Sequence, residues 1–183
     1  MGNQKRIHNT INKIGYTLVD LKMILITHSD GDHYGALNAL EKVTLARVGT
    51  SAIEAESIRA GSVSREMKAA GLQKSLFTLF GKVVGRNPKN ARIDDILIPG
   101  QVLPVLGGVR VLDTAGHTPG HLSFFSESEK ILFAGDSIVI QNSKPVPSSG
   151  SICWNEDKAR LAFDMQMKLD PVLICAGHGL YKV

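Results

Sequence analysis

The segment His28-Ser-Asp-Gly-Asp-His33 places two imidazoles and two carboxylates within six consecutive residues. It follows directly on the apolar run 22–27 (KMILIT), which has the composition of a buried strand. So many ionisable groups in one short loop are costly to pack unless a cation binds among them. The segment therefore predicts a metal-binding loop at the end of a strand, with its two histidines and two aspartates as candidate ligands.

Three further segments end in the same way, with an apolar run followed by Gly and then His or Asp. They are VRVLDTAGH (109–117), ILFAGD (131–136) and VLICAGH (172–178). In sheets that contain parallel strands, ligands bind beyond the carboxyl ends of those strands. Four strands that each deliver His or Asp predict a metal site at one rim of a sheet, and the last residue of each segment joins the candidate ligands.

Length and composition predict a single globular domain over residues 1–183, with 43% apolar residues for its core. The net charge is +4, but Lys and Arg are scattered, which favours a solvated surface over a nucleic-acid track. No stretch approaches the roughly 18 apolar residues that span a bilayer, and the first residues lack the apolar core of a signal peptide. Cys153 and Cys175 do not make a disulfide framework. We therefore expect a cytoplasmic protein.

Hydrophobic periodicity and turn residues predict a mixed α/β chain. Two helix starts are marked, by a Ser-x-x-Glu capping box at residue 51 and by Asn155 as an N-cap. Leu161, Met165 and Leu169 share one face of the last helix. The expected helices cover residues 3–14, 34–40, 51–61, 62–85 and 156–169. Strands are expected at residues 22–27, 102–106, 109–114, 122–125, 131–134 and 172–175, and an exposed loop at 141–151.

Four short motifs occur in order along the chain. Residues 27–35 (THSDGDHYG) match the pattern Thr-His-x-His-x-Asp-His-x-Gly at all but one position, and residues 114–120 (TAGHTPG) are similar to Thr-Pro-Gly-His-Thr-x-Gly. Gly135-Asp136 and Gly177-His178-Gly179 each follow an expected strand. Together the four motifs resemble those of the metallo-β-lactamase fold hydrolase superfamily. The resemblance runs from residue 1 to 183 and is specific for the superfamily, not for a substrate.

The resemblance implies an α/β (α+β) fold, the metallo-β-lactamase-type αββα sandwich. In the superfamily two or more strands usually precede the first helix, whereas this sequence enters that helix at about residue 3. We therefore expect the sandwich to be incomplete at its N-terminus. A sheet without those strands would expose apolar surface and a free edge, so we also expect a homo-oligomer that covers it.

The resemblance also implies a binuclear metal site with ligands from all four motifs. The first metal would be held by His28, Asp30 and His117, the second by Asp32, His33 and His178, and Asp136 would bridge both. We interpret His121 as a residue that supports the ligands and does not bind metal itself. Imidazole and carboxylate donors suit two divalent ions, with Zn²⁺ expected first and Fe²⁺ or Mn²⁺ as alternatives. A hydroxide bridging the metals would be the nucleophile, and the catalytic role of Asp32 would be to orient it and then protonate the leaving group.

One position departs from the family motif, because Asp30 stands where the family has its second His. With Asp32 and Asp136, three carboxylates then face two divalent ions. The extra charge makes the first metal less Lewis acidic and the site more tolerant of harder ions such as Mn²⁺ or Fe²⁺. Since Asp is also shorter than His, we expect the two metal sites to differ in affinity.

The combination of a bridging Asp136 with His178 is typical of the superfamily's thioester hydrolases, lactonases and phosphodiesterases, while its β-lactamases usually lack the bridging Asp. We therefore predict a metal-dependent hydrolase of a small ester, thioester or lactone, acting on a small molecule and not on a membrane or a nucleic acid. One alternative is a catalytically weak or inactive metal-binding protein, impaired by Asp30 and the missing strands. The other is a phosphodiesterase or nuclease, which the basic charge balance would suit.

Overall fold

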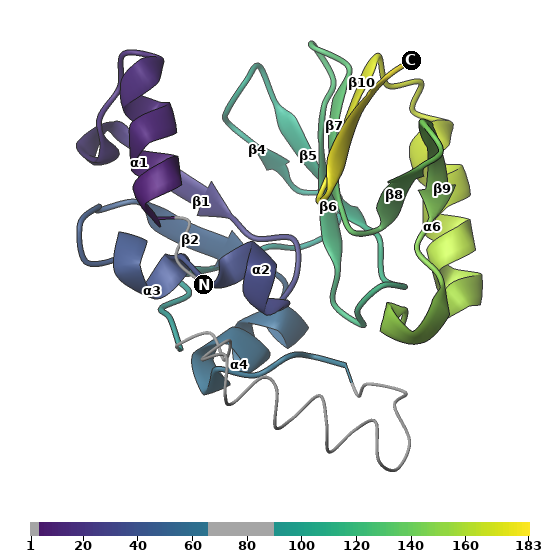
Figure 1. Ribbon diagram of the computed structural model, residues 1–183, viewed down its shortest axis with the longest axis horizontal. Coiled ribbons are helices and arrows are strands. Elements are labelled where there is room, and N and C mark those ends of the chain that lie inside the picture. The colour runs from purple at the N-terminus through teal and green to yellow at the C-terminus, as the bar shows by residue number, and fades with distance from the viewer. Residues whose placement is uncertain (1–3, 66–89) are drawn as a thin grey trace. The chain divides into compact units, whose positions relative to one another are not determined.

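The computed structural model describes residues 4–65 and 90–183 (Figure 1). These residues form two compact units. Unit 1 contains the described residues up to Val63 together with 90–96, and unit 2 contains the remaining ones. The interpretation of residues 1–183 as a single domain stays a prediction.

Unit 1 combines short helices with a parallel sheet of strand order β1-β2-β3. The first half of the unit contains α1 (Gln4–Lys13), the 3₁₀ turn η1 (Leu18–Asp20), β1 (Met23–Leu25), α2 (Gly31–Tyr34) and α3 (Leu37–Leu40). The second half contains β2 (Arg47–Thr50), α4 (Ala52–Ala60) and β3 (Asp95–Ile96). The expected helix at 3–14 and the expected strand at 22–27 are confirmed, the strand in shorter form. The helix expected at 34–40 is wrong as one continuous element, because the chain turns at Gly35 and Ala36 between α2 and α3.

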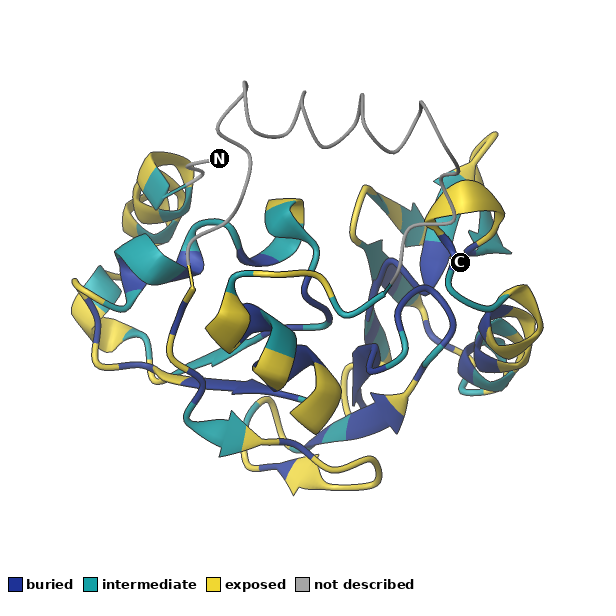
Figure 2. Ribbon diagram, turned by 90° about the horizontal axis from the view of Figure 1, so that it is seen from below, coloured by how far each residue is buried: buried dark blue, intermediate teal, exposed yellow. Residues whose placement is uncertain are grey.

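The core of unit 1 gathers apolar side chains from its helices, its strands and the segments between them. Figure 2 colours the buried residues dark blue. Its members are Ile26, Tyr34, Leu37, Val48, Ala55, Ile58, Ala91 and Ile93. Helix α4 begins at Ser51, whose Oγ accepts a hydrogen bond from Glu54 N at 3.3 Å. It ends at Gly61, which adopts a left-handed conformation with φ 66°, as expected for a glycine after a helix. The sequence-based boundaries of this helix are confirmed.

An ion pair joins neighbouring strands of unit 1, from Arg47 on β2 to Asp95 on β3. Arg47 Nε donates to Asp95 Oδ2 at 2.9 Å, and Arg47 Nη2 donates to Asp95 Oδ1. These hydrogen bonds lower the pKa of the Asp95 carboxyl and raise that of the Arg47 guanidinium. Since the Arg47 side chain is largely exposed, water and salt screen the pair, and its contribution to stability is expected to be small.

The Asp95→Asn variant is expected to be slightly less stable than the native protein at pH 7. Because the folded-state pKa of Asp95 is lowered, its contribution is present above the unfolded-state pKa of about 3.9 and is lost as the pH falls through the folded-state value. The difference in urea midpoint between Asp95→Asn and native protein should therefore be smaller at pH 3 than at pH 7, and it should shrink in high salt. The exposed Asp157→Asn serves as the control. An equal difference at pH 7 and pH 3 would contradict the ion-pair explanation.

Unit 2 is built on a six-stranded sheet of order β11-β10-β7-β6-β5-β4, with a separate β8-β9 hairpin. Its first strands are β4 (Val102–Leu103), β5 (Val109–Asp113), β6 (Leu122–Ser126) and β7 (Ile131–Gly135). They are followed by β8 (Ile138–Gln141), β9 (Lys144–Pro147), the 3₁₀ turn η2 (Gly150–Ile152), α6 (Glu156–Met167), β10 (Leu173–Ala176) and β11 (Gly179–Lys182). Figure 1 shows α6 beside the β8-β9 hairpin, and α6 contacts β9.

Strand directions in unit 2 bring three strand ends to one edge of the sheet. Strand β10 is parallel to β7, and Ala176 pairs with Gly135 at their carboxyl ends. Strand β5 is antiparallel to β6, which is antiparallel to β7, so β5 also runs in the direction of β7. The segments that follow β5, β7 and β10 therefore leave the sheet at the same edge, as the sequence predicts.

The structure differs from the sequence-based expectations at several further places. The exposed loop expected at 141–151 is wrong at 144–148, because β9 pairs with β8 and Ser148 is buried, whereas 142–143 and 149–151 are exposed. The sequence reasoning also missed β11, which follows β10 as an antiparallel neighbour. Of the face expected for the last helix, Met165 and Leu169 pack against the core, but Leu161 is exposed. The buried residues of α6 are Ala159, Ala162 and Gln166. Most of the helix expected at 62–85 lies outside the described residues, and residues 62–65 are not helical.

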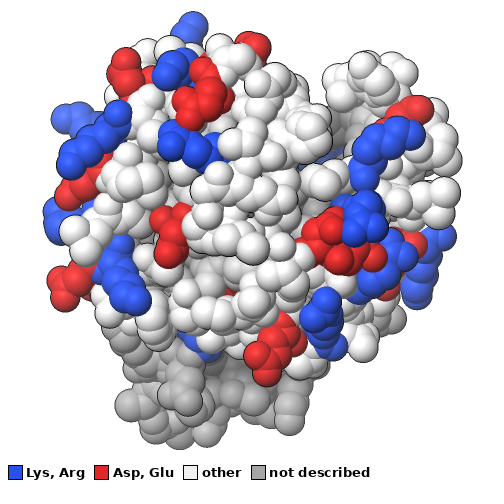
Figure 3. Space-filling view, turned by 180° about the vertical axis from the view of Figure 1, so that it is seen from behind, with Lys and Arg blue, Asp and Glu red and all other residues white. Residues whose placement is uncertain are grey.

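Positive and negative side chains are interspersed on the face shown in Figure 3. On that face Lys and Arg lie among Asp and Glu, without a continuous track of one sign. Among the described residues, no helix combines the length and the apolar character that crossing a bilayer requires.

Candidate metal centre

The candidate ligands of unit 1 lie in the loop after β1 and on the short helix α2 that follows it. The parallel pairing of β1 with β2 continues as far as Ile26, whose N donates to Gly49 O at 2.9 Å. The chain then leaves regular structure until Asp30, whose carbonyl oxygen accepts from His33 N at 2.9 Å and from Tyr34 N at 3.2 Å. These two bonds start α2 at Asp30, and they place the second half of the motif on its first turn.

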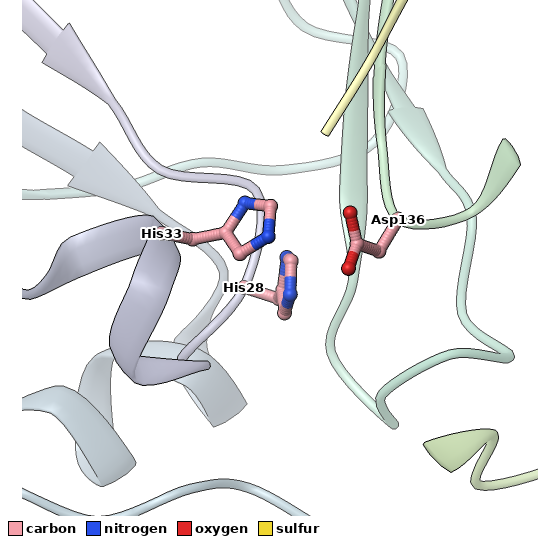
Figure 4. A group of neighbouring side chains, drawn as sticks. All are labelled: His28, His33 and Asp136. Atoms are coloured by element: carbon pink, nitrogen blue, oxygen red, sulfur yellow. The ribbon is translucent and has the colours of Figure 1, made fainter. Parts of the chain in front are cut away.

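The side chains of this loop lie close together within unit 1. His28 Nδ1 is 2.9 Å from Thr27 Oγ1, and His28 Nε2 is 3.6 Å from Asp30 Oδ2. The rings of His28 and His33 have centroids 4.1 Å apart and planes tilted by 45° (Figure 4). His33 Nε2 in turn lies 3.7 Å from Asp32 Oδ2. His28 is fully buried, whereas the Asp32 side chain is 61% exposed, so the cluster extends from the interior to the surface.

The candidate ligands of unit 2 meet at the sheet edge described above. Asp136 follows β7 (Figure 4), His178 follows β10, and His117 lies in the turn after β5. Asp136 Oδ2 is 3.7 Å from His117 Nε2 and 3.5 Å from His178 Nε2. His117 and Asp136 are buried, while the His178 side chain is 63% exposed.

The spacings within each unit suit shared cations better than direct contacts. Nitrogen–oxygen separations of 3.5 to 3.7 Å exceed the usual 2.7–3.2 Å of a hydrogen bond. Two ligand atoms that each lie about 2.1 Å from one tetrahedral ion are about 3.4 Å apart. Imidazole nitrogen and carboxylate oxygen are also ligands that Zn²⁺ accepts. The donor set of each unit therefore fits divalent metal.

Ser148 fixes the ring of His117 from the β8-β9 side of unit 2. Its Oγ lies 2.9 Å from His117 Nδ1, and both side chains are buried. With Nδ1 engaged in this way, Nε2 is the nitrogen directed to Asp136. A hydrogen bond of this kind sets the orientation of a ligating imidazole and the tautomer that it adopts. The sequence reasoning missed Ser148, since the residue belongs to a segment interpreted as an exposed loop.

His121 uses both ring nitrogens within unit 2. Asp136 N donates to His121 Nε2 at 3.2 Å, so Nε2 is an acceptor and the proton of the neutral ring belongs on Nδ1. Nδ1 then donates to Thr114 Oγ1 at 2.8 Å. His121 therefore holds the backbone of Asp136, and its ring nitrogens are directed to these two groups.

A buried hydrogen-bond network continues from Thr114 to helix α6. Thr114 Oγ1 is 2.9 Å from Ser123 Oγ, which donates to Ala134 O at 3.0 Å. Ser137 Oγ lies 3.2 Å from Ser123 Oγ and 3.1 Å from Gln166 Oε1. The side chains of this network are fully buried, so each hydrogen bond avoids the cost of an unsatisfied polar group.

The turn that carries His117 is attached to the start of α6. Asn155 N donates to Gly116 O at 2.9 Å, and Trp154 N donates to His117 O at 3.0 Å. Asn155 also caps the helix, because its side chain accepts from Lys158 N at 2.9 Å, which confirms the expected N-cap. A β-carbon on Gly116 would lie 2.5 Å from both N and Cα of Ala159, so only glycine fits this position without a shift of α6.

Two other ionisable groups near the motifs are protonated at neutral pH. Burial, and secondarily the charge of Asp30, raise the pKa of Tyr34 to about 12, and its hydroxyl donates to Ser62 O at 3.4 Å. Burial also raises the pKa of the Cys175 thiol. Neither group has the lowered pKa that activates a side-chain nucleophile. These two side chains therefore offer structural support and not covalent chemistry.

Comparison with known proteins identifies the family. A family model described as the metallo-beta-lactamase superfamily matches residues 2–178. The probable metallo-hydrolase YflN of Bacillus subtilis (strain 168) is 31% identical over 180 residues, which cover 87% of this chain and 65% of YflN. A hydroxyacylglutathione hydrolase of Rhodopseudomonas palustris (strain BisA53) is 30% identical over 129 residues, which cover 68% of this chain and 35% of that enzyme.

A solved structure gives the same family fold. TTHA1623 in a di-iron-bound form matches with a TM-score of 0.73 and 18% identity, over 99% of this chain and 80% of that one. At this identity the likeness concerns the fold alone. The fold class and the superfamily expected from the four motifs are confirmed. The chain belongs to the metallo-β-lactamase superfamily.

Proposed function

We propose that this chain is a metal-dependent hydrolase with a binuclear centre that acts on a small thioester, ester or lactone. In this proposal the ligands of both units serve one centre, as membership of the superfamily implies. The first ion is assigned to His28, Asp30 and His117, the second to Asp32, His33 and His178, and Asp136 is assigned to both. The observation that carries the proposal is the ligand-type spacing of 3.5 to 3.7 Å around His28 and around Asp136.

Zn²⁺ is the metal that the donor set favours first, with iron as the alternative. Four imidazoles and three carboxylates suit Zn²⁺, while the added carboxylate of Asp30 suits a harder ion. The solved structure of TTHA1623 is a di-iron-bound form, which gives precedent within the fold. Bound divalent metals would polarise the substrate carbonyl and lower the pKa of an attacking water.

The protein's own residues would divide the remaining work. The exposed Asp32 carboxylate lies at the solvent side of its cluster, where it can accept a proton from the attacking water and deliver it to the leaving group. Ser148 orients His117 through Nδ1, and His121 holds the backbone N–H of Asp136. Such fixed partners keep ligands in place, so that they need not reorganise during the reaction.

Thioester hydrolysis is supported by the relatives more than the other reactions are. YflN is described as a probable metallo-hydrolase, and the R. palustris relative as a hydroxyacylglutathione hydrolase. The chain spans only 65% and 35% of these two proteins, so their substrates come to this chain as candidates only. The mixed charges in Figure 3 give no support to a nucleic-acid substrate.

The proposal is tested by turnover of a hydroxyacyl-glutathione thioester, a simple aryl ester and a phosphodiester, before and after metal loading. We expect metal-dependent cleavage of the thioester or the ester. Faster cleavage of the phosphodiester, with strong salt dependence, would overturn the substrate class. Absence of turnover on all three with metal bound would leave a metal-binding protein and contradict the hydrolase proposal.

The two ions are expected to leave at different rates because of Asp30. Dialysis against a chelator should leave about one ion per chain at an intermediate stage, since the carboxylate at this position is shorter than the family's histidine. The Asp30→His variant, which restores the family motif, should hold its two ions more equally. Metal analysis along the dialysis measures both. Two equally resistant ions in the native protein would contradict this assignment.

A further inference from the structure

Glu54, on the first turn of α4, contacts the backbone of the metal-binding loop in unit 1. Its Oε2 accepts a hydrogen bond from Ser29 N at 2.8 Å, across 25 positions of sequence. Ser29 lies between His28 and Asp30, two of the assigned ligands. Glu54 therefore contacts the backbone N–H of the residue that separates these two ligands in the chain.

The loop depends on such long-range contacts because it lacks regular structure. Residues 26–30 belong to neither a helix nor a strand, and Ile26 N is the last amide bonded to β2. Asp30 O accepts hydrogen bonds at the start of α2. The bond from Ser29 N to Glu54 lies between these two points, and it ties the loop to a helix that is packed into the core of unit 1.

The placement of Glu54 is unusual for a glutamate and costly without a function. Its side chain is fully buried, as is Ser29, and Glu is seldom fully buried unless it is paired. The sequence pattern Ser51-x-x-Glu54 predicts that the carboxylate would return to the start of its own helix. Ser51 does cap the helix, and the Glu54 carboxylate accepts a hydrogen bond from Ser29 N, outside its own helix.

We propose that Glu54 is a positioning residue, which holds the peptide between His28 and Asp30 so that both side chains face the first metal. The proposal rests on the metal centre proposed above, but Glu54 is not among its ligands. It acts through the length and the acceptor oxygen of its side chain, not through its negative charge. A role of the negative charge and a role of the side-chain length predict different effects for variants of Glu54. Substitutions can therefore separate the two roles.

Three substitutions separate these properties. Glu54→Gln removes the charge and keeps an acceptor oxygen at the same distance along the side chain. Glu54→Asp keeps the charge and withdraws the carboxylate by one methylene. Glu54→Met keeps the approximate length and removes the acceptor. The exposed Glu56 on the same helix supplies matched controls, Glu56→Gln and Glu56→Met.

The first measurement is hydrogen exchange of the Ser29 amide in the metal-free protein, which does not depend on metal binding. In Glu54→Gln we expect the protection factor of the Ser29 amide to stay within about threefold of the native value. In Glu54→Asp and Glu54→Met we expect this protection factor to fall by about tenfold or more. The second measurement is Zn²⁺ affinity by competition with a chromophoric chelator. Glu54→Asp and Glu54→Met should lower the affinity for the first Zn²⁺ ion by about 10- to 100-fold, and the affinity of Glu54→Gln should stay close to the native value.

The outcomes distinguish this inference from the proposed function. Native affinity in Glu54→Asp with a loss in Glu54→Gln would show that charge matters, and would overturn the positioning role. Unchanged Ser29 protection in Glu54→Met would also overturn it. If native protein binds no Zn²⁺ while Ser29 protection follows the expected order, then the proposed centre fails and the hydrogen bond to the loop stands. Should Glu54→Met not fold, the comparison of Glu54→Gln with Glu54→Asp decides alone.

Discussion

Metal-dependent hydrolysis should fall by about 10³-fold in the Asp136→Ala variant, which corresponds to about 4 kcal/mol of transition-state stabilisation. Asp136 Oδ2 lies 3.7 Å from His117 Nε2 and 3.5 Å from His178 Nε2, so loss of the carboxylate removes the group shared by both histidines. Steady-state kinetics on the best substrate, with metal content measured on the same sample, tests this expectation.

The Asp136→Ala variant should nevertheless remain folded. Its backbone N–H can still donate to His121 Nε2, so the end of β7 keeps its attachment. The metal-free variant should therefore unfold close to the temperature of metal-free native protein, while metal should stabilise the native protein more than the variant. Asp164→Ala, at an exposed position of α6, is the matched control. Near-native turnover in Asp136→Ala would remove this residue from the proposed centre.

The second large effect is expected from Gly116→Ala in unit 2. The new β-carbon would lie 2.5 Å from N and Cα of Ala159, and backbone atoms of a helix cannot move aside as a flexible side chain can. Overpacking of this kind costs about 3 kcal/mol, the upper end of the usual range. For a chain of 183 residues, that loss lowers Tm by about 6–12 °C. Thermal unfolding of the metal-free protein measures it.

A matched glycine separates steric clash from backbone strain. Gly100 has φ +88°, and a β-carbon there would meet nothing within 4 Å. Gly100→Ala should therefore lower the free energy of unfolding by only about 1–2 kcal/mol, because alanine is disfavoured in the left-handed conformation. Because Gly116 precedes His117, Gly116→Ala should also weaken metal binding, whereas Gly100→Ala should not. Equal loss of stability in the two variants would contradict the role of the contact with α6.

The strands and their terminal ligands could be predicted because their signals are local. The apolar runs before His28 and before Asp136 become β1 and β7. The cap at Asn155 and the glycine end at Gly61 are equally local, and both are confirmed. Each of these features depends on residues within a few positions of one another.

His121 was expected to support the ligands, but the supporting contacts of Ser148 and Glu54 were missed because their partners are distant in sequence. Ser148 is 31 positions from His117, and Glu54 is 25 positions from Ser29. Pro145 and Pro147 favoured a loop over a strand, yet a hairpin of only two strands tolerates residues that lack an N–H.

The error at Leu161 has another cause. Apolar residues at helical spacing predict a buried face, and Met165 and Leu169 do pack against the core of unit 2. Leu161 is exposed, however, and the buried residues of α6 are Ala159, Ala162 and Gln166. Gln166 contributes to the core through its hydrogen bonds to Ser137 Oγ and Ala162 O. A hydrophobic pattern does not report a buried face that is stabilised by a polar network.

The metal content of the purified protein, measured by elemental analysis before and after loading with Zn²⁺, tests the proposed centre most directly. The proposal predicts about two ions per chain after loading, with turnover of a thioester or ester that rises with occupancy. Near-zero metal after loading, and no gain in turnover, would contradict it. In that case the histidines and aspartates of the two units would have another role than a metal centre.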